Sequence, residues 1–123
     1  MYDMKALYQA KSVADAVALR VAHPEAQIIA GGSDVLVQMR EGKRAGVELI
    51  SIYGLDELRG VTMEDDGTLR IGSLTSFSHI TRDPLIQKYL NVLGEAVDQV
   101  GGPQIRNIGT IGGNTCNGVI IRL

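Results

Sequence analysis

Two of the three Gly-Gly pairs, Gly31-Gly32 in the first half of the chain and Gly112-Gly113 in the second, constrain its fold more than any other sequence feature. The first pair, Gly31-Gly32, follows the apolar run 27–30 and precedes apolar residues at helical spacing over 35–39. This pattern predicts a buried strand, a tight turn and a short helix that begins at Ser33 or Asp34. Glycine lacks a Cβ atom, so the backbone of such a turn is open to close approach by another group.

The remaining patterns of the first half predict a helix and a second strand. Ser12, with Asp15 three residues later, resembles a capping box that has Asp in place of Glu or Gln. Apolar residues follow at helical spacing, which predicts an amphipathic helix from Ser12 to about Ala22. The apolar run 47–52 predicts a strand that is broken at Gly54.

The second half begins with a hairpin and continues with helices. Asp66-Gly67, between two short runs within 60–72, is a strong sequence signal for a β-hairpin. Ser76 is suited to cap a short helix. A longer helix is expected over 85–100, with a break near Asn91.

These elements predict an α+β fold with two parts. Residues 104–117, which include the second glycine pair, are expected to form a loop. The change from alternating helices and strands to a hairpin followed by helices places a seam near 54–60. We therefore expect a first αβ subdomain over residues 1–57 and an incomplete second subdomain over 58–123.

Composition and charge argue against several classes of protein. Twelve Lys and Arg against fourteen Asp and Glu give a net charge of −2, and neither sign forms a run, so no nucleic-acid partner is expected. No apolar stretch approaches the roughly 20 residues that span a bilayer. The first residues also lack the layout of a signal peptide, so we expect no membrane association and a cytoplasmic location. One cysteine and two histidines are too few for a zinc or iron–sulfur centre, so redox chemistry would need an organic cofactor.

The pairs Gly31-Gly32 and Gly112-Gly113 lie in candidate phosphate-binding loops. A strand that ends in Gly-Gly and runs into a helix presents free N–H groups and the positive end of the helix dipole, as is expected of Ala30-Gly31-Gly32-Ser33-Asp34. The carboxylate of Asp34 would repel phosphate, so we expect it to cap the helix instead. The second segment, Thr110-Ile111-Gly112-Gly113-Asn114, offers a hydroxyl, two glycine amides and an amide side chain. Taken alone, each loop is more often a plain glycine turn, and neither matches a known nucleotide fingerprint.

Taken together, these residues resemble the FAD-binding subunit of the xanthine dehydrogenase group of molybdenum hydroxylases. The resemblance covers about residues 2–118, and order and spacing agree throughout. It is carried by Ile28-Ile29-Ala30-Gly31-Gly32-Ser33-Asp34-Val35-Leu36, by Leu69-Arg70-Ile71-Gly72-Ser73 with Thr75, and by Gly102-Pro103-Gln104-Ile105-Arg106-Asn107 leading into Thr110-Ile111-Gly112-Gly113-Asn114. It implies an α+β FAD-binding fold of the vanillyl-alcohol oxidase/PCMH type, with the first subdomain and part of the second.

The resemblance also implies the cofactor, its contacts and the partners. FAD would be held at its diphosphate by two sets of residues. The sets are Gln27, Ile28, Ile29, Ala30, Gly31, Gly32, Ser33 and Asp34, and then Gly109, Thr110, Ile111, Gly112, Gly113 and Asn114. In such enzymes a purine is oxidised at a molybdenum cofactor on another subunit, electrons cross the 2Fe-2S clusters of a further subunit, and the flavin passes hydride to NAD. The share of this chain would be electron transfer, with no residue catalytic on the purine.

The sequence departs from the family pattern after Gly118. Family members continue through a Ser-Asp pair that helps to fix the flavin, complete the second subdomain and add a C-terminal domain. This sequence instead reads Val119-Ile120-Ile121-Arg122-Leu123, so we expect a truncated product. Two alternatives stay open: a non-catalytic remnant that binds little or no flavin, and an unrelated nucleotide-binding module that uses the first loop alone.

Two single residues beside the second loop have competing explanations. Arg106 is equally suited to contact a phosphate and to tie its loop to a backbone carbonyl. Cys116 has no Lys, Arg or His within nine residues in the sequence other than Arg122, so a packed, inert thiol is expected.

Overall fold

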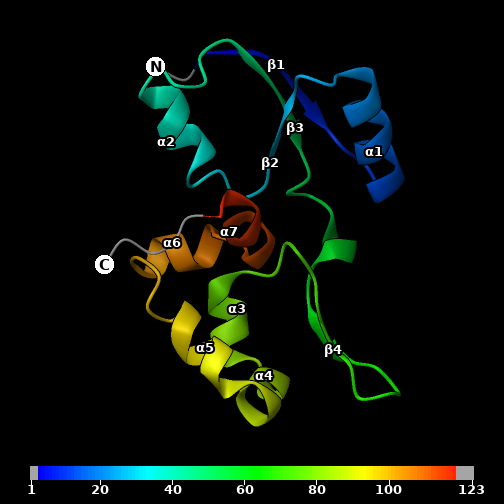
Figure 1. The fold of residues 1–123 in the computed structure, drawn as a ribbon, viewed down its shortest axis with the longest axis vertical. Coiled ribbons are helices and arrows are strands. Elements are labelled where there is room, and N and C mark those ends of the chain that lie inside the picture. The colour runs from blue at the N-terminus through cyan, green and yellow to red at the C-terminus, as the bar shows by residue number, and fades with distance from the viewer. Residues whose placement is uncertain (1–2, 119–123) are drawn as a thin grey trace. The chain divides into compact units, whose positions relative to one another are not determined.

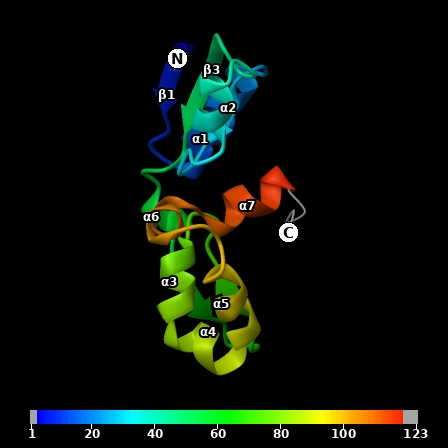
Figure 2. The same ribbon diagram turned by 90° about the vertical axis from the view of Figure 1, so that its left-hand side faces the viewer.

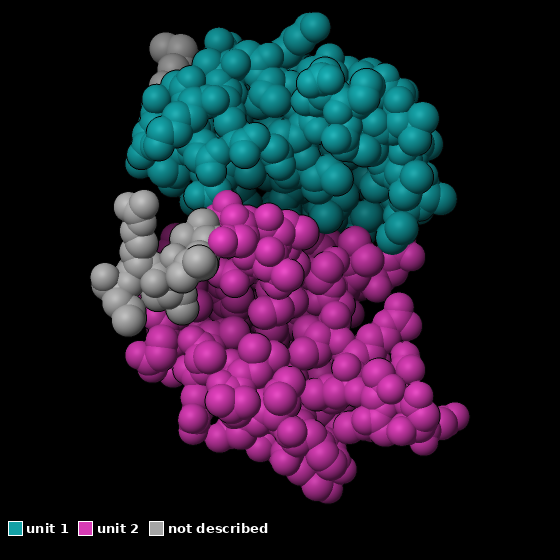
Figure 3. Space-filling view, viewed as in Figure 1, with its two compact units in different colours: residues 1–55 teal, residues 56–123 magenta. Residues whose placement is uncertain are grey.

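The computed structural model of the chain describes residues 3–118, drawn as ribbons in Figure 1 and Figure 2. The chain divides into two compact units, which Figure 3 colours separately: unit 1 comprises residues 1–55 and unit 2 comprises residues 56–123. The boundary lies within the stretch 54–60 where the sequence indicates a seam. Residues 119–123, on which the expectation of a truncated product depends, lie outside the described residues.

Unit 1 is a small parallel sheet with a helix on each side. Its elements are β1 (Met4–Gln9), α1 (Val13–Ala22), β2 (Gln27–Ile29), α2 (Val35–Arg40) and β3 (Val47–Ser51). The strand order is β1-β3-β2, and β3 runs parallel to both neighbours. The chain crosses the sheet in one direction through α1 and returns through α2. Right-handed crossovers in opposite directions put the two helices on opposite faces, as Figure 1 shows.

Strand β1 is not among the elements that the sequence predicts. Its sequence, with Lys5 and Gln9 among six residues, lacks the apolar run that marks a buried strand. In the structure none of the six residues is buried. It is a strand because β3 offers it an edge to pair with: Leu7 lies opposite Leu49 and Tyr8 opposite Ile50. Such pairing depends on residues about forty positions away, which local patterns do not reveal.

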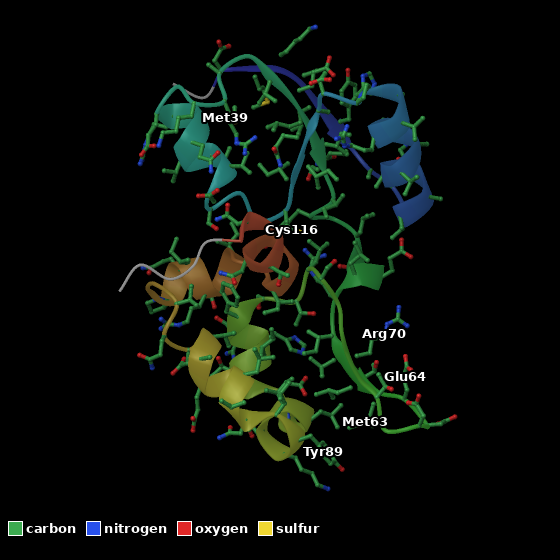
Figure 4. The ribbon with its side chains drawn as sticks, viewed as in Figure 1. Met39, Met63, Glu64, Arg70, Tyr89 and Cys116 are labelled. Atoms are coloured by element: carbon green, nitrogen blue, oxygen red, sulfur yellow. The ribbon has the colours of Figure 1, made fainter. Side chains whose placement is uncertain are left out.

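The other elements of unit 1 agree with the sequence prediction. α1 begins after Ser12, whose Oγ accepts a hydrogen bond from the Asp15 N–H at 3.0 Å, and β2 and β3 lie in the predicted runs. On the other side of the sheet, α2 buries Met39 against Ile29 and Leu49 (Figure 4). This cluster holds the start of α2, and with it the loop after β2, against the sheet.

Unit 2 is a β-hairpin followed by a group of short helices. Its elements are the 3-10 helix η1 (Asp56–Leu58), β4 (Val61–Met63), β5 (Leu69–Ile71), α3 (Phe77–Arg82), α4 (Pro84–Tyr89), α5 (Asn91–Val97), α6 (Pro103–Ile108) and α7 (Ile111–Asn117). The hairpin is antiparallel, as Asp66-Gly67 predicts, and Ser76 caps α3 by accepting the N–H of His79 at 3.1 Å. The helix expected over 85–100 is divided at Leu90 into α4 and α5, next to the predicted break.

The prediction of a loop over 104–117 is wrong, because this stretch forms α6 and α7. Pro103 occupies the first turn of α6, a favoured position since its missing N–H has no helical partner there, and Thr110 caps α7. The glycines of the stretch have low helix propensity, which explains the loop-like sequence signal. Packing outweighs that propensity: α6 lies against α3, and Ile111 packs against the core of unit 2.

The core of unit 2 lies between its helices and the hairpin. Its buried residues are Phe77, Ile80, Ile86 and Val97, and Val61, Leu69, Ile71, Leu93, Val100 and Ile111 pack around them. Figure 1 shows α3, α4 and α5 grouped beside the hairpin. The helices are short, and none within residues 3–118 is long and apolar enough to cross a membrane.

Thr75 is a buried polar residue that joins the hairpin to the helices. It is 1% exposed, and its Oγ1 accepts the N–H of Gly60 at 3.0 Å and donates to the Gly60 carbonyl at 3.3 Å. Its own carbonyl accepts the N–H of Ile111 at 3.0 Å. One residue therefore connects the start of β4 with the start of α7.

Replacing Thr75 with Val should lower the free energy of unfolding of unit 2 by about 1–3 kcal/mol, because the Gly60 N–H loses its acceptor while the side-chain shape is kept. The Gly60 carbonyl keeps its bond from the Gly72 N–H at 2.9 Å. Urea unfolding followed by circular dichroism measures the change. Thr62 on β4 is exposed, so Thr62→Val is the matched control and should shift the free energy by less than about 0.5 kcal/mol. Equal effects of the two substitutions would contradict the role given to Thr75.

Candidate functional site

The first candidate loop, residues 30–34, connects β2 with α2 in unit 1. In the sheet formed by the described strands, β2 lies at an edge and pairs with β3 alone. Gly32 has a φ of +77°, and a Cβ atom there would lie 3.1 Å from Leu36 Cδ1. A positive φ strains residues other than glycine, so the sharp turn by itself requires Gly32.

The backbone N–H groups of residues 31–35 are the unusual feature of this loop. None of these five N–H groups has a hydrogen-bond acceptor within residues 3–118. The first helical bond of α2 runs from the Leu36 N–H to the Gly32 carbonyl at 3.0 Å. Gly31 and Gly32 are half-buried, whereas Ser33 is exposed. Unpaired backbone donors need water or a ligand as partner, so the loop presents a run of donors to whatever lies against it.

Asp34 does not cap α2, contrary to the expectation from the sequence. It occupies the N-cap position, but its side chain makes no capping hydrogen bond. Its backbone is helical, with φ −104° and ψ −47°, whereas a capping residue is usually extended so that its side chain meets the N–H groups of the first turn. Its Oδ2 instead accepts a hydrogen bond from Gln38 Nε2 at 2.6 Å.

Four side chains around the first loop form one chain of hydrogen bonds, here called the Arg44 network: Gln27, Arg44, Gln38 and Asp34. Arg44 Nη1 donates to Gln27 Oε1 at 2.6 Å, and Arg44 Nε donates to Gln38 Oε1. Gln38 then donates to Asp34, as described above. Sequence reasoning missed Arg44, because it lies 17 residues from Gln27 and belongs to no motif.

The second candidate loop, residues 109–114, connects α6 with α7 in unit 2. Thr110 is 4% exposed and caps α7, since its Oγ1 accepts the N–H of Gly113 at 3.0 Å. The N–H of Ile111 donates to the Thr75 carbonyl at 3.0 Å, and the N–H of Gly112 donates to the Ser73 carbonyl at 2.8 Å. The three N–H groups at the start of α7 are therefore all bound inside the protein.

This geometry differs from the expectation that the second loop offers two free glycine amides. Gly112 is required for another reason: a Cβ atom there would lie 2.6 Å from the Ser73 carbonyl oxygen. The backbone N–H of Asn114 donates to the Thr110 carbonyl at 3.0 Å. Its side-chain amide is exposed and has no hydrogen-bond partner among the residues that the structure describes. Asn114 is thus the polar group that this loop has to offer a ligand.

The structure describes the two loops separately. It brings residues 27–34 together with Gln38 and Arg44 in unit 1, and residues 109–114 together with Ser73 and Thr75 in unit 2. That both loops contact one diphosphate stays a prediction.

Two residues beside the second loop now have definite positions. Arg106 Nη1 donates to the carbonyls of Gly101 at 2.7 Å and Val100 at 3.3 Å, so it ties down the connection between α5 and α6. Cys116 on α7 is exposed, which corrects the expectation of a packed thiol (Figure 4). In the described part of the chain, no three His, Cys, Asp or Glu side chains converge as a metal site would need.

The chain matches the family model of the FAD binding domain in molybdopterin dehydrogenase over residues 2–122. A putative xanthine dehydrogenase FAD-binding subunit of Escherichia coli strain K12 is 43% identical over 118 residues, which are 96% of this chain and 40% of the relative. The carbon monoxide dehydrogenase medium chain of Hydrogenophaga pseudoflava is 38% identical over 109 residues, or 88% of this chain and 38% of the relative. The resemblance found in the sequence is confirmed, and the chain spans about 40% of the length of these relatives.

Solved structures agree with this result. The carbon monoxide dehydrogenase from Hydrogenophaga pseudoflava that lacks the Mo-pyranopterin moiety of its molybdenum cofactor is similar with a TM-score of 0.90 and 34% sequence identity. The match covers 96% of this chain and 41% of that chain. The predicted α+β fold of the FAD-binding, PCMH type is therefore confirmed, and the chain covers part of the full domain.

The close packing of α7 on Ser73 makes Gly112 sensitive to substitution. Gly112→Ala should lower the free energy of unfolding of unit 2 by about 1–3 kcal/mol, since backbone atoms must move to admit a methyl group. Gly102→Ala is the control in the same unit: φ there is −97°, and the added Cβ atom would meet only the flexible end of Gln104, at 3.4 Å. Thermal unfolding of both variants measures the difference, and an equally stable Gly112→Ala variant would contradict the described packing.

Proposed function

The chain belongs to the family of FAD-binding domains in molybdopterin dehydrogenases, and we propose that it binds FAD by holding the diphosphate on the loop of residues 30–34. The observation that carries this proposal is the run of five unpaired N–H groups at residues 31–35. A diphosphate is a dense group of negatively charged acceptor oxygens, so it needs several convergent donors at close range. A glycine turn leading into a helix supplies such donors without a basic side chain.

The residues of the first loop fit a diphosphate. Gly31 and Gly32 leave the backbone open, and the exposed hydroxyl of Ser33 is a further donor. Asp34 is the one acidic residue of the loop, and its carboxylate is held by Gln38. The side chain of Ile29 is buried in the core of unit 1, so Ile29 would meet the cofactor only through its backbone.

The second loop, residues 109–114, contributes differently in this proposal. Its first three helical N–H groups are already bound, which leaves the exposed side-chain amide of Asn114 as the donor. We assign to Asn114 the contact of this loop with the cofactor, and to the glycines the close packing that places it. In the first loop, Gln27 through Asp34 remain the proposed cofactor-binding residues. Within Gly109 through Asn114, Asn114 is the proposed contact and the other residues hold it in place.

We further propose that the chain serves as the FAD-binding part of a xanthine dehydrogenase-like molybdenum hydroxylase. The support is the names of its relatives: one is a xanthine dehydrogenase FAD-binding subunit, and another is the medium chain of a carbon monoxide dehydrogenase. Partners would be a molybdenum-cofactor subunit and a 2Fe-2S subunit. When bound, FAD supplies the redox chemistry that connects iron–sulfur clusters with NAD, and the residues of this chain hold and orient it.

The 123-residue chain should take up FAD when the two are mixed. Flavin absorption should stay with the protein through gel filtration, and the melting temperature should rise with FAD concentration, because a ligand at 100 times its Kd stabilises the folded state by about 2.7 kcal/mol. Absence of both signals would overturn the proposal and favour the alternative of a remnant that binds little or no flavin.

Substitutions in the two loops separate the proposal from that of a nucleotide-binding module that uses the first loop alone. Gly32→Val should abolish FAD binding, and Ser33→Ala and Asn114→Ala should each weaken it about three- to tenfold, the effect of one lost hydrogen bond. Gln104→Ala, an exposed change on α6, is the control. Fluorescence titration with FAD gives the affinities. An unchanged affinity in Asn114→Ala would leave the first loop as the only contact.

A further inference from the structure

Asp34 conflicts with the proposed function, because its carboxylate lies at the end of a loop that is proposed to bind an anion. The N–H groups of residues 31–35 are as good a set of donors for this carboxylate as for a phosphate. Asp at the N-cap position commonly binds the first N–H groups of its own helix. A free Asp34 side chain would therefore compete with the cofactor for the same donors and repel it as well.

The structure shows the carboxylate bound elsewhere. Gln38, one turn further along α2, donates from Nε2 to Asp34 Oδ2 at 2.6 Å, so the side chain lies along the helix. Gln38 can present Nε2 to Asp34 because its Oε1 is taken by Arg44 Nε. Arg44 is held in turn by Gln27 Oε1 at 2.6 Å, at the start of β2.

Arg44 is suited to hold Gln38 and Gln27 at the same time, whereas its neighbour Lys43 is not. Lys43 forms an ion pair with Glu41 at 2.9 Å, and this bond raises the pKa of Lys43. Arg44 is half-buried, and its planar guanidinium binds two acceptors at once in a defined geometry, which a lysine does not do.

We propose that the Arg44 network positions Asp34 so that the donors of the first loop stay free for the diphosphate. Arg44 and Gln38 are thus positioning residues: they act through Asp34 and touch no part of the cofactor. This inference rests on the proposed function. It assigns a role to Gln38 and Arg44, which lie outside both cofactor-binding sets.

A double-mutant cycle on the 123-residue chain tests the inference, with FAD titrated by flavin fluorescence. Gln38→Met and Arg44→Met should each weaken FAD binding about fivefold, the effect of one screened negative charge brought next to the diphosphate. Adding Asp34→Asn to either variant should restore the affinity to within about twofold, since the released side chain then carries no charge. The loss in Gln38→Met should also shrink as sodium chloride is raised, because salt screens the repulsion.

Arg40→Met is the matched control, because it removes the same charge as Arg44→Met at a position four residues earlier, at the end of α2. The side chain of Arg40 is exposed and makes no hydrogen bond or ion pair with any residue that the structure describes. Its replacement should change FAD affinity less than about twofold. Losses in Gln38→Met and Arg44→Met that persist with Asp34→Asn would show that the network only supports the fold, and would overturn this inference alone. A wild-type chain that fails to bind FAD would overturn the proposed function together with it.

Discussion

The edge position of β2 is the constraint on which the candidate site depends. The last ladder bond at this strand runs from the Ile52 N–H to the Ile29 carbonyl, and the first helical bond of α2 ends at the Gly32 carbonyl. Between these two bonds the backbone has left the sheet and has not yet entered the helix. Its N–H groups therefore have no internal partner, and the site is the direct result of that gap.

The two glycine loops look alike in sequence and differ in what their backbones do. At Gly32 the missing side chain permits a left-handed turn, and the donors that follow stay open. At Gly112 the missing side chain permits the start of α7 to lie directly on Ser73. The first three N–H groups of α7 are bound there, by the carbonyls of Thr75 and Ser73 and by Thr110 Oγ1. A Gly-Gly pair before a helix therefore does not by itself indicate a free anion site. The neighbours of the backbone decide which of the two results is obtained.

Much of the fold follows from local patterns. Ser12 and Ser76 cap helices as predicted, and Asp66-Gly67 forms the hairpin turn, because each depends on contacts within a few residues. Strand β1 and helices α6 and α7 were not predicted, since each depends on packing against distant segments. The family was recognised from the order and spacing of its motifs, which need no knowledge of contacts.

The same distinction applies to the candidate site. The sequence points to both loops and to Asp34 as a carboxylate that would repel a phosphate. It predicts that Asp34 caps the helix, whereas in the structure its side chain is bound to Gln38. Arg44 was invisible to sequence reasoning, because a side chain 17 residues from its partner leaves no local pattern. Nor does the sequence reveal that Ser73 and Thr75 bind the amides of the second loop.

The sequence by itself determined the family, the α+β fold class and the positions of the two glycine loops. These properties reside in residue types and their spacing along the chain. Only the tertiary structure decided that the first loop keeps its donors free and that the second does not. The reason is physical: a backbone N–H is available or bound according to which carbonyl folding brings within hydrogen-bond distance, and here those carbonyls come from β5–α3 connection residues far from α7 in the sequence.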